Sequence, residues 1–409
     1  MKRLVLLIVS ALVFASHAAA QQSLVPAPPA ISASGYLLMD ADSGEVLIEH
    51  NADERLPPAS LTKLMTSYVL SYELEQGQVS NSDLVTISKN AWAQNPIFTG
   101  SSLMWIEVGK QVTLGDLHKG VVISSGNDAS VAVAEYLAGS EDAFAGIMNQ
   151  HAQMLGLENT HFVNSHGLPH PEHYTSARDL AILARAIIDF PNEYALYSEK
   201  EFVYNNIRQN NRNGLLWTDP SVDGLKTGHT NEAGYCLVTS AKREGMRLIS
   251  VVMGASSERV RERETQKLLS YGFRYFETHH LYSAGTELTK AKVWKGGSAD
   301  VALGVQDDVY LTIPRGKADD LDAQWESDVL ASDFDLDAAV LQIELGVAHA
   351  CARLSTGGVR CWGDNRLGQT GYGAIGVYGD APGEVAALGY VEFADALPCV
   401  KLSTGGTMS

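Results

Sequence analysis

The chain contains few cysteines, an excess of acidic over basic residues and only one long apolar run. Four cysteines among 409 residues are too few for a disulfide-held scaffold, so the core must depend on apolar packing. Thirty Lys and Arg face 48 Asp and Glu, and the formal charge of −18 disfavours binding to nucleic acid phosphates. Beyond the N-terminal run no stretch of about 18 apolar residues occurs, so we expect a mature protein that is soluble or only peripherally attached to a membrane.

The N-terminus has the layout of a secretory signal peptide. Basic residues at Lys2 and Arg3 precede an apolar run from residue 4 to 15 and the small triplet at 18–20. This pattern predicts export and removal of residues 1–20. The alternative, a membrane anchor, is disfavoured because the run is too short to cross a bilayer. A Pro- and Ala-rich leader at 21–33 follows.

Residues 34–280 show the alternation expected of one α/β unit. Apolar runs at 36–39 and 46–48 predict two strands joined by a tight turn, and a mixed helical region follows from about 60 to 189. Near its end, apolar residues at helical spacing up to residue 188 follow Ser176, which is expected to cap a helix. Runs at 235–238 and 247–252 predict a hairpin, and 258–276 has helical periodicity. We therefore expect the first and last segments to share one sheet.

The C-terminal part divides into three smaller segments. Strand-like runs at 292–294, 301–303 and 309–313 predict a partial β-rich domain at 281–318. Eight acidic residues and no basic residue lie from 319 to 337, which indicates an acidic linker at 319–340. In the tail at 341–409, the octapeptide at 351–358 recurs at 399–406 with six identical positions. A period of 48 residues is typical of propeller blades, and one copy plus a fragment predicts a partial repeat.

Three short motifs carry the chemistry. Ser60 and Lys63 form an S-x-x-K motif, and their spacing puts both side chains on one face of a helix. A lysine with a neutral amine at that position can take the serine proton. Ser125-Gly126-Asn127 follows an apolar run on a turn before a helix, and Lys226-Thr227-Gly228 lies in a strand, where the glycine would let a substrate backbone approach closely. Their order matches the penicillin-binding and serine β-lactamase class.

Longer matches make the resemblance specific. The chain resembles the low-molecular-weight penicillin-binding proteins that are D-alanyl-D-alanine carboxypeptidases, from about residue 34 to 317. The matching segments are Pro58-Ala59-Ser60-Leu61-Thr62-Lys63-Leu64-Met65-Thr66, Asn127-Asp128-Ala129, Ser176-Ala177-Arg178-Asp179, Asn211-Arg212-Asn213-Gly214-Leu215-Leu216-Trp217 and Lys226-Thr227-Gly228-His229-Thr230. The resemblance implies a catalytic domain of the β-lactamase/transpeptidase-like fold, with an antiparallel sheet, flanking helices and a helical subdomain.

The resemblance also implies the reaction and the role of each residue. The expected reaction is removal of the terminal D-alanine from peptidoglycan pentapeptide stems, in cell wall biogenesis and the control of cell shape. Ser60 is expected to attack as nucleophile with Lys63 as base, and Ser125 with Lys226 to relay a proton. The remaining residues are expected to bind substrate. Asn127 is expected to hydrogen-bond the peptide stem, and Arg212 and Thr227 to hold the terminal carboxylate. The backbone N–H groups of Ser60 and of His229, which follows Gly228, are expected to stabilise the oxyanion.

Two alternative functions remain open. A β-lactamase-like hydrolase of class A needs a glutamate in an E-x-x-L-N segment to activate water, and none lies between Asn127 and Lys226. Lys63 is therefore expected to serve both half-reactions, and β-lactams to act as slowly leaving inhibitors. A non-catalytic interaction protein would act through the tail, which resembles repeats of the regulator-of-chromosome-condensation type at 346–369.

No cofactor and no metal are expected. Four histidines, His161, His166, His170 and His173, invite a zinc site, but Gly167, Pro169 and Pro171 break any helix that could align them, so we favour a polar loop at the rim of the site. Cys351 and Cys361 are spaced to pair across a hairpin, which sequence alone does not decide.

The expected location is the periplasm. Relatives in the family usually end in an amphipathic helix that lies on the inner membrane. We expect that helix and the rest of the second domain to be missing after about Lys317, which leaves peripheral membrane association open.

Overall fold

The computed structural model describes residues 25–292, 300–321, 340–345, 349–354, 359–364 and 377–378. The predicted signal peptide, part of the leader and most of the acidic linker lie outside the described residues. The second copy of the tail octapeptide, at 399–406, lies outside them as well.

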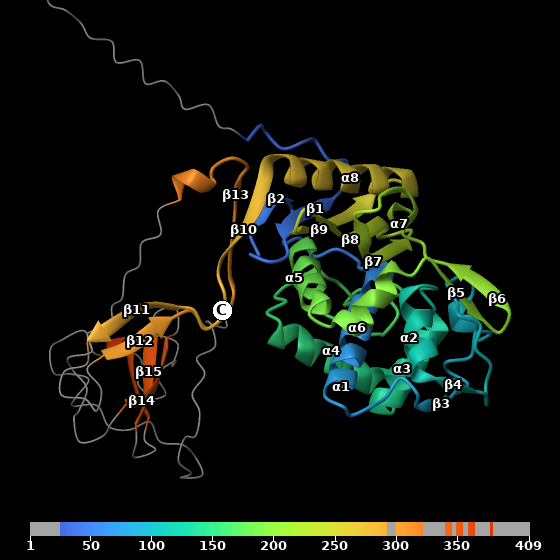
Figure 1. Cartoon of the computed structure of the whole chain (residues 1–409). Coiled ribbons are helices and arrows are strands. Elements are labelled where there is room, and N and C mark those ends of the chain that lie inside the picture. The colour runs from blue at the N-terminus through green and yellow to red at the C-terminus, as the bar shows by residue number, and fades with distance from the viewer. Residues whose placement is uncertain are drawn as a thin grey trace, which may run out of the picture.

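A five-stranded antiparallel sheet organises the N-terminal two thirds of the chain. Its strand order is β2-β1-β9-β8-β7 (Figure 1). The strands are β1 (Gly35–Asp40), β2 (Val46–His50), β7 (Val222–Thr230), β8 (Gly234–Arg243) and β9 (Met246–Ala255). β1 pairs with β9 along its whole length. The expectation that the first and last segments share a sheet is thereby confirmed, as is the β8–β9 hairpin.

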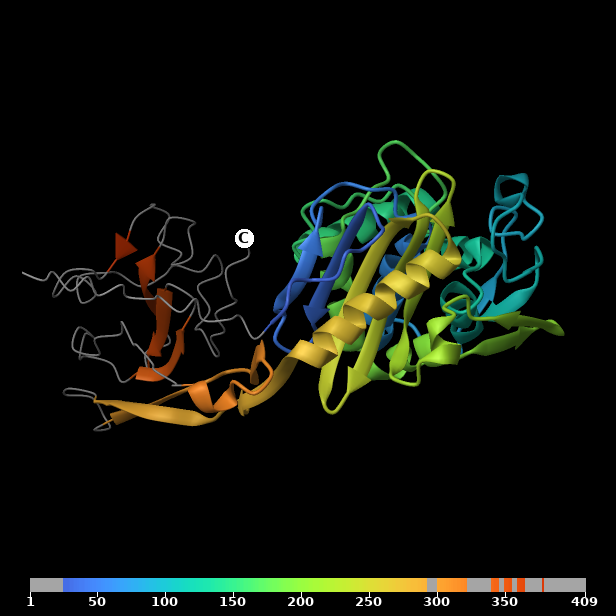
Figure 2. The ribbon, with the colours of Figure 1, turned by 90° about the horizontal axis from the view of Figure 1, so that it is seen from above.

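Both faces of the sheet carry apolar side chains. Residues alternate between the two faces along a strand, so successive apolar residues enter different cores. Leu37 and Val251 belong to the core shared with the helical subdomain, whereas their neighbours Leu38 and Val252 belong to the core under α8 (Glu258–Tyr275). Figure 2 shows α8 lying across one face of the sheet and most of the other helices behind the sheet. The predicted α/β organisation is confirmed, and the structure adds that the sheet lies between two separate cores in a three-layer unit.

The other face of the sheet carries most of the remaining helices of this unit, whereas Leu215 and Leu216 belong to the core under α8. Ser176 caps α5, since its hydroxyl accepts from the backbone N–H of Asp179 at 3.1 Å, as the Ser cap in the sequence predicted. The α-helices are α1 (Lys63–Glu75), α2 (Leu114–Val122), α3 (Asn127–Ala138), α4 (Glu141–Met154), α5 (Ala177–Ile188), α6 (Pro191–Tyr194) and α7 (Leu215–Thr218). Short 3₁₀ turns are η1 (Ala59–Thr62), η2 (Pro96–Phe98) and η3 (Ala195–Ser198). Two small hairpins are β3 (Leu84–Thr86) with β4 (Gln111–Thr113), and β5 (Glu201–Tyr204) with β6 (Ile207–Asn210).

A second, smaller β-region follows α8 without a linker. The helix ends at Tyr275, one residue earlier than its periodicity predicted, because Phe276 is already extended and opens β10 (Phe276–Tyr282). β10 pairs with β13 (Val309–Pro314), and β11 (Glu287–Lys292) pairs with β12 (Asp300–Gly304). A 3₁₀ turn, η4 (Ala318–Asp320), ends the described part. The β10–β13 ribbon is tied to β1, because Thr278 Oγ1 donates to Asp40 Oδ2 at 2.5 Å.

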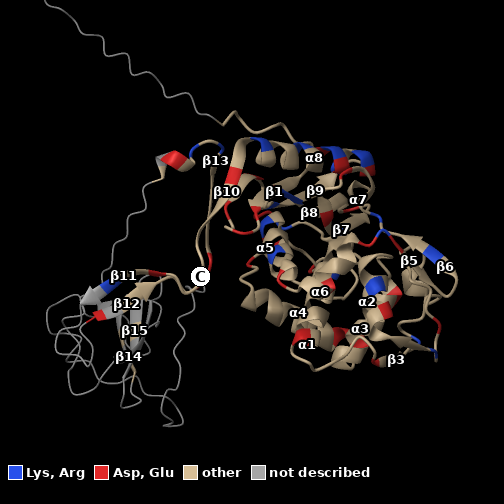
Figure 3. Cartoon of the chain, in the orientation of Figure 1, with Lys and Arg blue, Asp and Glu red and all other residues tan. Residues whose placement is uncertain are grey.

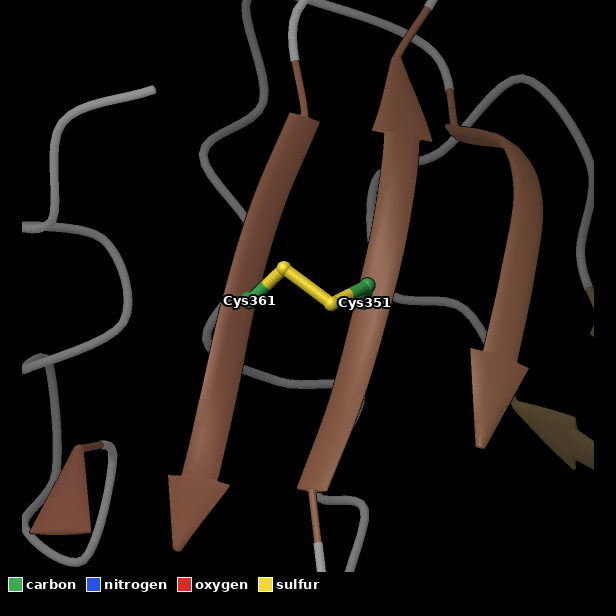
Figure 4. Close-up of a disulfide and its surroundings, with 2 residues drawn as sticks. All are labelled: Cys351 and Cys361. Carbon is green, nitrogen blue, oxygen red and sulfur yellow. A yellow bond between two sulfur atoms is a disulfide. The ribbon is translucent and has the colours of Figure 1, made fainter. Parts of the chain in front are cut away.

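The described part of the tail forms one antiparallel sheet. Its strands run in the order β14 (Val340–Leu345), β15 (His349–Leu354), β16 (Val359–Asp364) and β17 (Val377–Tyr378). Cys351 and Cys361 face each other in the β15–β16 register and form a disulfide (Figure 4). The pairing that the sequence left open is thus present. Within the described residues this is a single sheet, and a propeller is not confirmed.

Neither a membrane span nor a basic face emerges from the described residues. No helix among them combines the length and apolar character needed to cross a bilayer. Lys and Arg are interspersed with Asp and Glu along α8 (Figure 3).

Candidate active site

The predicted nucleophile and base meet where η1 passes into α1. Ser60 lies in η1 and Lys63 is the first residue of α1. Lys63 Nζ lies 3.2 Å from Ser60 Oγ, so the i,i+3 spacing brings the two groups within hydrogen-bond reach, as predicted. Ala59, just before the serine, has a φ of 48°. A non-glycine residue in the left-handed region is uncommon and is found most often where function fixes the backbone.

Lys63 is enclosed and its charged form is disfavoured. Its side chain is about 1% exposed. The amine donates to Asn127 Oδ1 at 2.7 Å and to the main-chain oxygen of His166 at 2.6 Å. Burial lowers the pKa of Lys63 to about 7, against the opposing effect of the Asp128 carboxylate. A large fraction of the lysine is therefore neutral at pH 7 and able to accept a proton.

A second Ser–Lys pair faces the first. Ser125 lies on the turn between α2 and α3 with a φ of 58°, and Lys226 projects from β7. Lys226 Nζ lies 2.9 Å from Ser125 Oγ and 3.0 Å from the main-chain oxygen of Thr227. Burial, with smaller contributions from Lys63, Arg212 and Arg261, holds the pKa of Lys226 well below its usual value. The fold thus builds two hydrogen-bonded Ser–Lys pairs, each with a buried lysine, at one site.

One cleft connects these groups. Seven of the nine predicted site residues line it, whereas Lys63 and Lys226 lie buried beneath its floor, 1% and 3% exposed. The lining residues that sequence reasoning named are Ser60, Ser125, Asn127, Arg212, Thr227, Gly228 and His229. Those that it did not assign to the site include Ser101, Ser102, Leu168, Thr230, Glu258 and Arg261. Segments from six other parts of the chain therefore converge on Ser60.

Asp128 fixes the wall opposite β7. Its buried carboxylate accepts hydrogen bonds from the backbone N–H groups of Met104, Trp105 and Ile106 at 2.8 to 3.1 Å. Burial nevertheless raises the pKa of Asp128, and the backbone donors oppose that effect. Sequence reasoning noted Asp128 only as part of a matching segment; its position next to Asn127 in the first turn of α3 was the available signal.

Two glycines leave room for the backbone around Ser60. A Cβ on Gly228 would lie 3.0 Å from Pro58 O and 3.3 Å from Ala59 Cβ, and one on Gly167 would lie 1.8 Å from Ala59 O. These contacts give a second reason for glycine at 228, and the close approach of a substrate there stays a prediction. In the folded chain the nearest neighbours of Gly228 belong to the η1 segment that carries the nucleophile.

The four histidines of the 161–173 segment serve different partners. His173 Nε2 lies 2.7 Å from Thr62 Oγ1, and His161 Nδ1 lies 2.6 Å from the main-chain oxygen of Glu172. His170 Nδ1 accepts from the N–H of Glu172, while His166 lines the active-site cleft. In the described ranges no three His, Cys, Asp or Glu side chains are grouped to hold a metal ion. Residues 166–168 of the segment line the cleft, and sequence reasoning did not name His166 as a residue of the site.

Family models match three parts of the chain. Residues 21–257 match the model described as D-alanyl-D-alanine carboxypeptidase. Residues 276–348 match the C-terminal domain of penicillin-binding protein 5, so the second-domain resemblance extends further than the expected end near Lys317. Residues 340–369 match a regulator of chromosome condensation repeat, which agrees with the resemblance of the tail.

Individual relatives cover most of the chain. The D-alanyl-D-alanine carboxypeptidase DacA of Escherichia coli is 51% identical over 332 residues, which span 80% of this chain and 82% of that protein. DacC of the same organism is 49% identical over 315 residues, 76% and 78% of the two chains.

Solved structures agree with these matches. Penicillin-binding protein 5 of Haemophilus influenzae superimposes with a TM-score of 0.73 at 45% identity, over 81% of this chain and 95% of that one. Penicillin-binding protein 6B of Escherichia coli superimposes with a TM-score of 0.66 at 42% identity, over 74% of this chain and 90% of that one. Together with the paired Ser–Lys groups in their cleft, these matches establish that the chain belongs to the D-alanyl-D-alanine carboxypeptidase family of penicillin-binding proteins.

Proposed function

We propose that the protein is a serine-type carboxypeptidase that removes the terminal D-alanine of peptidoglycan pentapeptide stems through an acyl-enzyme on Ser60. The observation that carries this proposal is the 3.2 Å contact between Ser60 Oγ and a Lys63 amine whose pKa is about 7. A serine hydroxyl is a weak nucleophile unless a neighbouring base removes its proton. Lys63 is the basic group within reach of Ser60 in the described structure.

Acylation uses both Ser–Lys pairs. Lys63 takes the proton of Ser60 as Oγ bonds to the carbonyl carbon of the penultimate D-alanine, which becomes tetrahedral. Backbone N–H groups of Ser60 and His229 stabilise the negative oxygen. The C–N bond then breaks, and the departing D-alanine amine takes up the proton that Lys63 received, relayed through Ser125 and Lys226, 2.9 Å apart. Lys63 is thereby neutral again.

Binding groups lie on both sides of the nucleophile. Asn127 holds the peptide stem, and it also accepts from Lys63 at 2.7 Å. Arg212 and Thr227 line the same cleft and hold the terminal carboxylate, with Gly228 and His229 continuing the strand. The Arg212 guanidinium suits a carboxylate because it offers paired donors in a fixed plane.

Deacylation returns through Lys63. Lys63 takes a proton from water as the water oxygen attacks the ester, and Ser60 recovers its proton as the ester bond breaks. The absence of an E-x-x-L-N segment between Asn127 and Lys226 distinguishes this arrangement from a class A β-lactamase. β-Lactams, which resemble the D-alanyl-D-alanine end, should acylate Ser60 and leave slowly.

Mass spectrometry of the protein after brief incubation with penicillin G tests the proposal. We expect a persistent adduct on Ser60, absent from Ser60→Ala and retained in Ser102→Ala, a serine in the lining of the same cleft. Rapid hydrolysis of the antibiotic without an adduct would favour the β-lactamase alternative. An inert protein with intact antibiotic would instead favour the interaction role for the tail.

The same proposal extends to location and organisation. Export by residues 1–20 places the enzyme in the periplasm, and the Cys351–Cys361 disulfide supports an oxidising compartment. We propose that 34–280 is the catalytic domain and that the β14–β17 sheet is one propeller-type repeat after the second β-domain. Fractionation of cells before and after a high-salt wash tests peripheral attachment to the inner membrane.

A further inference from the structure

The loop at 164–168 supplies one of the acceptors that orient the catalytic lysine. His166 O accepts from Lys63 Nζ at 2.6 Å, the shortest hydrogen bond of that amine. Gly167 abuts Ala59 with no room for a side chain. A small shift of this loop would therefore move the base relative to Ser60.

Glu141, in the first turn of α4, holds this loop from outside. Its Oε1 accepts from the Ser165 N–H at 3.0 Å and from Ser165 Oγ at 2.7 Å. The same oxygen lies 3.3 Å from His166 Nε2. Ser165 and His166 are buried, whereas the Glu141 side chain remains 27% exposed. One carboxylate thus binds two successive loop residues whose own carbonyls face α1.

The loop also contacts α1 directly. Thr66 Oγ1 donates to Ser165 O at 2.6 Å, one residue before the carbonyl that receives Lys63. Glu141 on one side and α1 on the other therefore fix the peptide between Ser165 and His166.

His166 contacts Glu141 as a neutral group. Burial, followed by the charges of Lys63 and His173, lowers the pKa of His166 to about 3. The Leu168 N–H donates to His166 Nδ1 at 3.1 Å, so the ring proton resides on Nε2, the nitrogen nearest Glu141. The negative charge of Glu141 is therefore not neutralised by this imidazole near pH 7.

We propose that Glu141 is a positioning residue for the carboxypeptidase reaction: its carboxylate fixes the 164–168 loop so that the His166 carbonyl holds the Lys63 amine against Ser60, and its charge acts on that base. The inference rests on the proposed role of Lys63. It adds to the site a residue on α4 that does not line the cleft.

Several charges compete at the lysine. Glu141 and Asp128 favour its protonated form, whereas Arg212 disfavours it. The other titratable groups that face Lys63 from neighbouring elements are Lys226 on β7, and His166 and His173 on the 161–173 segment. Removing the charge of Glu141 alone should therefore lower the pKa of Lys63.

Three variants separate position from charge. Glu141→Gln keeps an oxygen for Ser165 and removes the charge, Glu141→Ala removes both, and Asp142→Asn removes an exposed charge from the same helical turn. The measurement is the rate of acylation by penicillin G from pH 5.5 to 9, with the melting temperature of each variant. Wild-type acylation serves as the reference and tests the proposed function independently.

The variants should differ in kind. We expect Glu141→Ala to acylate about 10- to 100-fold more slowly at pH 8, because a misplaced base is costly. Glu141→Gln should stay within about threefold at pH 8, with its acid limb displaced so that the ratio of rates at pH 6 and pH 8 rises about twofold. Asp142→Asn should match the wild type.

Two results would overturn the proposal. One is Glu141→Ala acylating within twofold of the wild type at pH 8. The other is an acid limb in Glu141→Gln that coincides with that of Asp142→Asn. The second result decides the matter even if Glu141→Ala does not fold.

Discussion

The two Ser–Lys pairs share their chemistry but not their origin. Ser60 and Lys63 are three residues apart and meet within one helical turn. Ser125 and Lys226 are 101 residues apart and meet only because β7 packs beside the α2–α3 turn. Both lysines are buried, yet Lys63 has three oxygen partners and Lys226 two. The local pair can form from the geometry of one helical turn, whereas the distant pair depends on the whole domain being folded.

Removing the local base should have the largest effect. We expect Lys63→Met to lower the rate of acylation by about 10⁴-fold, because Ser60 then lacks a group to take its proton. The protein should remain folded, since an apolar side chain suits that buried position. Stopped-flow acylation by a chromogenic β-lactam measures the rate. A loss of less than tenfold would assign the proton transfer to the second pair.

Removing the distant base should cost less. Lys226→Met is expected to slow release of D-alanine from a pentapeptide by about 10²- to 10³-fold, the range of a general acid–base group. Ser125→Ala should give a similar loss, and the double variant little more, because the two residues act as one relay. Additive losses would show that the pair does not work as a unit.

The pH dependence distinguishes the pairs further. Because the neutral form of Lys63 is the base and its pKa is about 7, acylation should fall roughly tenfold per pH unit below that value and level off above it. Ser125→Ala should keep the same acid limb at a lower rate. If the acid limb of the pH–rate profile disappeared in Ser125→Ala, the titrating group would belong to the distant pair instead of Lys63.

The packing between the two pairs gives the smallest expected effect. Gly228→Ala would put a Cβ 3.0 Å from Pro58 O and 3.2 Å from Leu61 Cγ, which should destabilise the fold by about 1 to 3 kcal/mol and slow acylation a few-fold. Gly146→Ala, in open space on α4, is the matched control and should be neutral or stabilising. Thermal unfolding compares the two. Equal melting temperatures of the two variants would show that the packing of β7 against η1 does not need a glycine at 228.

Sequence reasoning predicted the residues whose signal is local. The S-x-x-K spacing, the Ser176 cap and the hairpin of β8 and β9 follow from short-range geometry, and the structure has all three. The resemblance supplied the partners of Lys226. Glu141 and His166 were not predicted as partners of the site, because their contacts join α4, a loop and α1 across long separations. For Gly228 the residue was predicted, but its neighbours in the fold were not.

The tail shows the same limit. The spacing of Cys351 and Cys361 suggested a hairpin, and the register of β15 and β16 puts them opposite each other. The repeat period predicted a blade-like unit, but a period does not determine how many sheets assemble. Burial of a blade depends on neighbours, which local sequence does not specify.

The glycines that enclose Ala59 also limit how this enzyme can become resistant to β-lactams. A side chain at Gly167 would collide with Ala59 O, and one at Gly228 would crowd Pro58 O, so substitutions there should harm turnover of peptidoglycan along with drug binding. The opposite wall, which includes Ser101 and Ser102, is less constrained. Its loop is held to Asp128 by backbone N–H groups, and these contacts do not depend on which side chains line the cleft. We therefore expect variants that discriminate between drug and substrate to arise at Ser101 and Ser102.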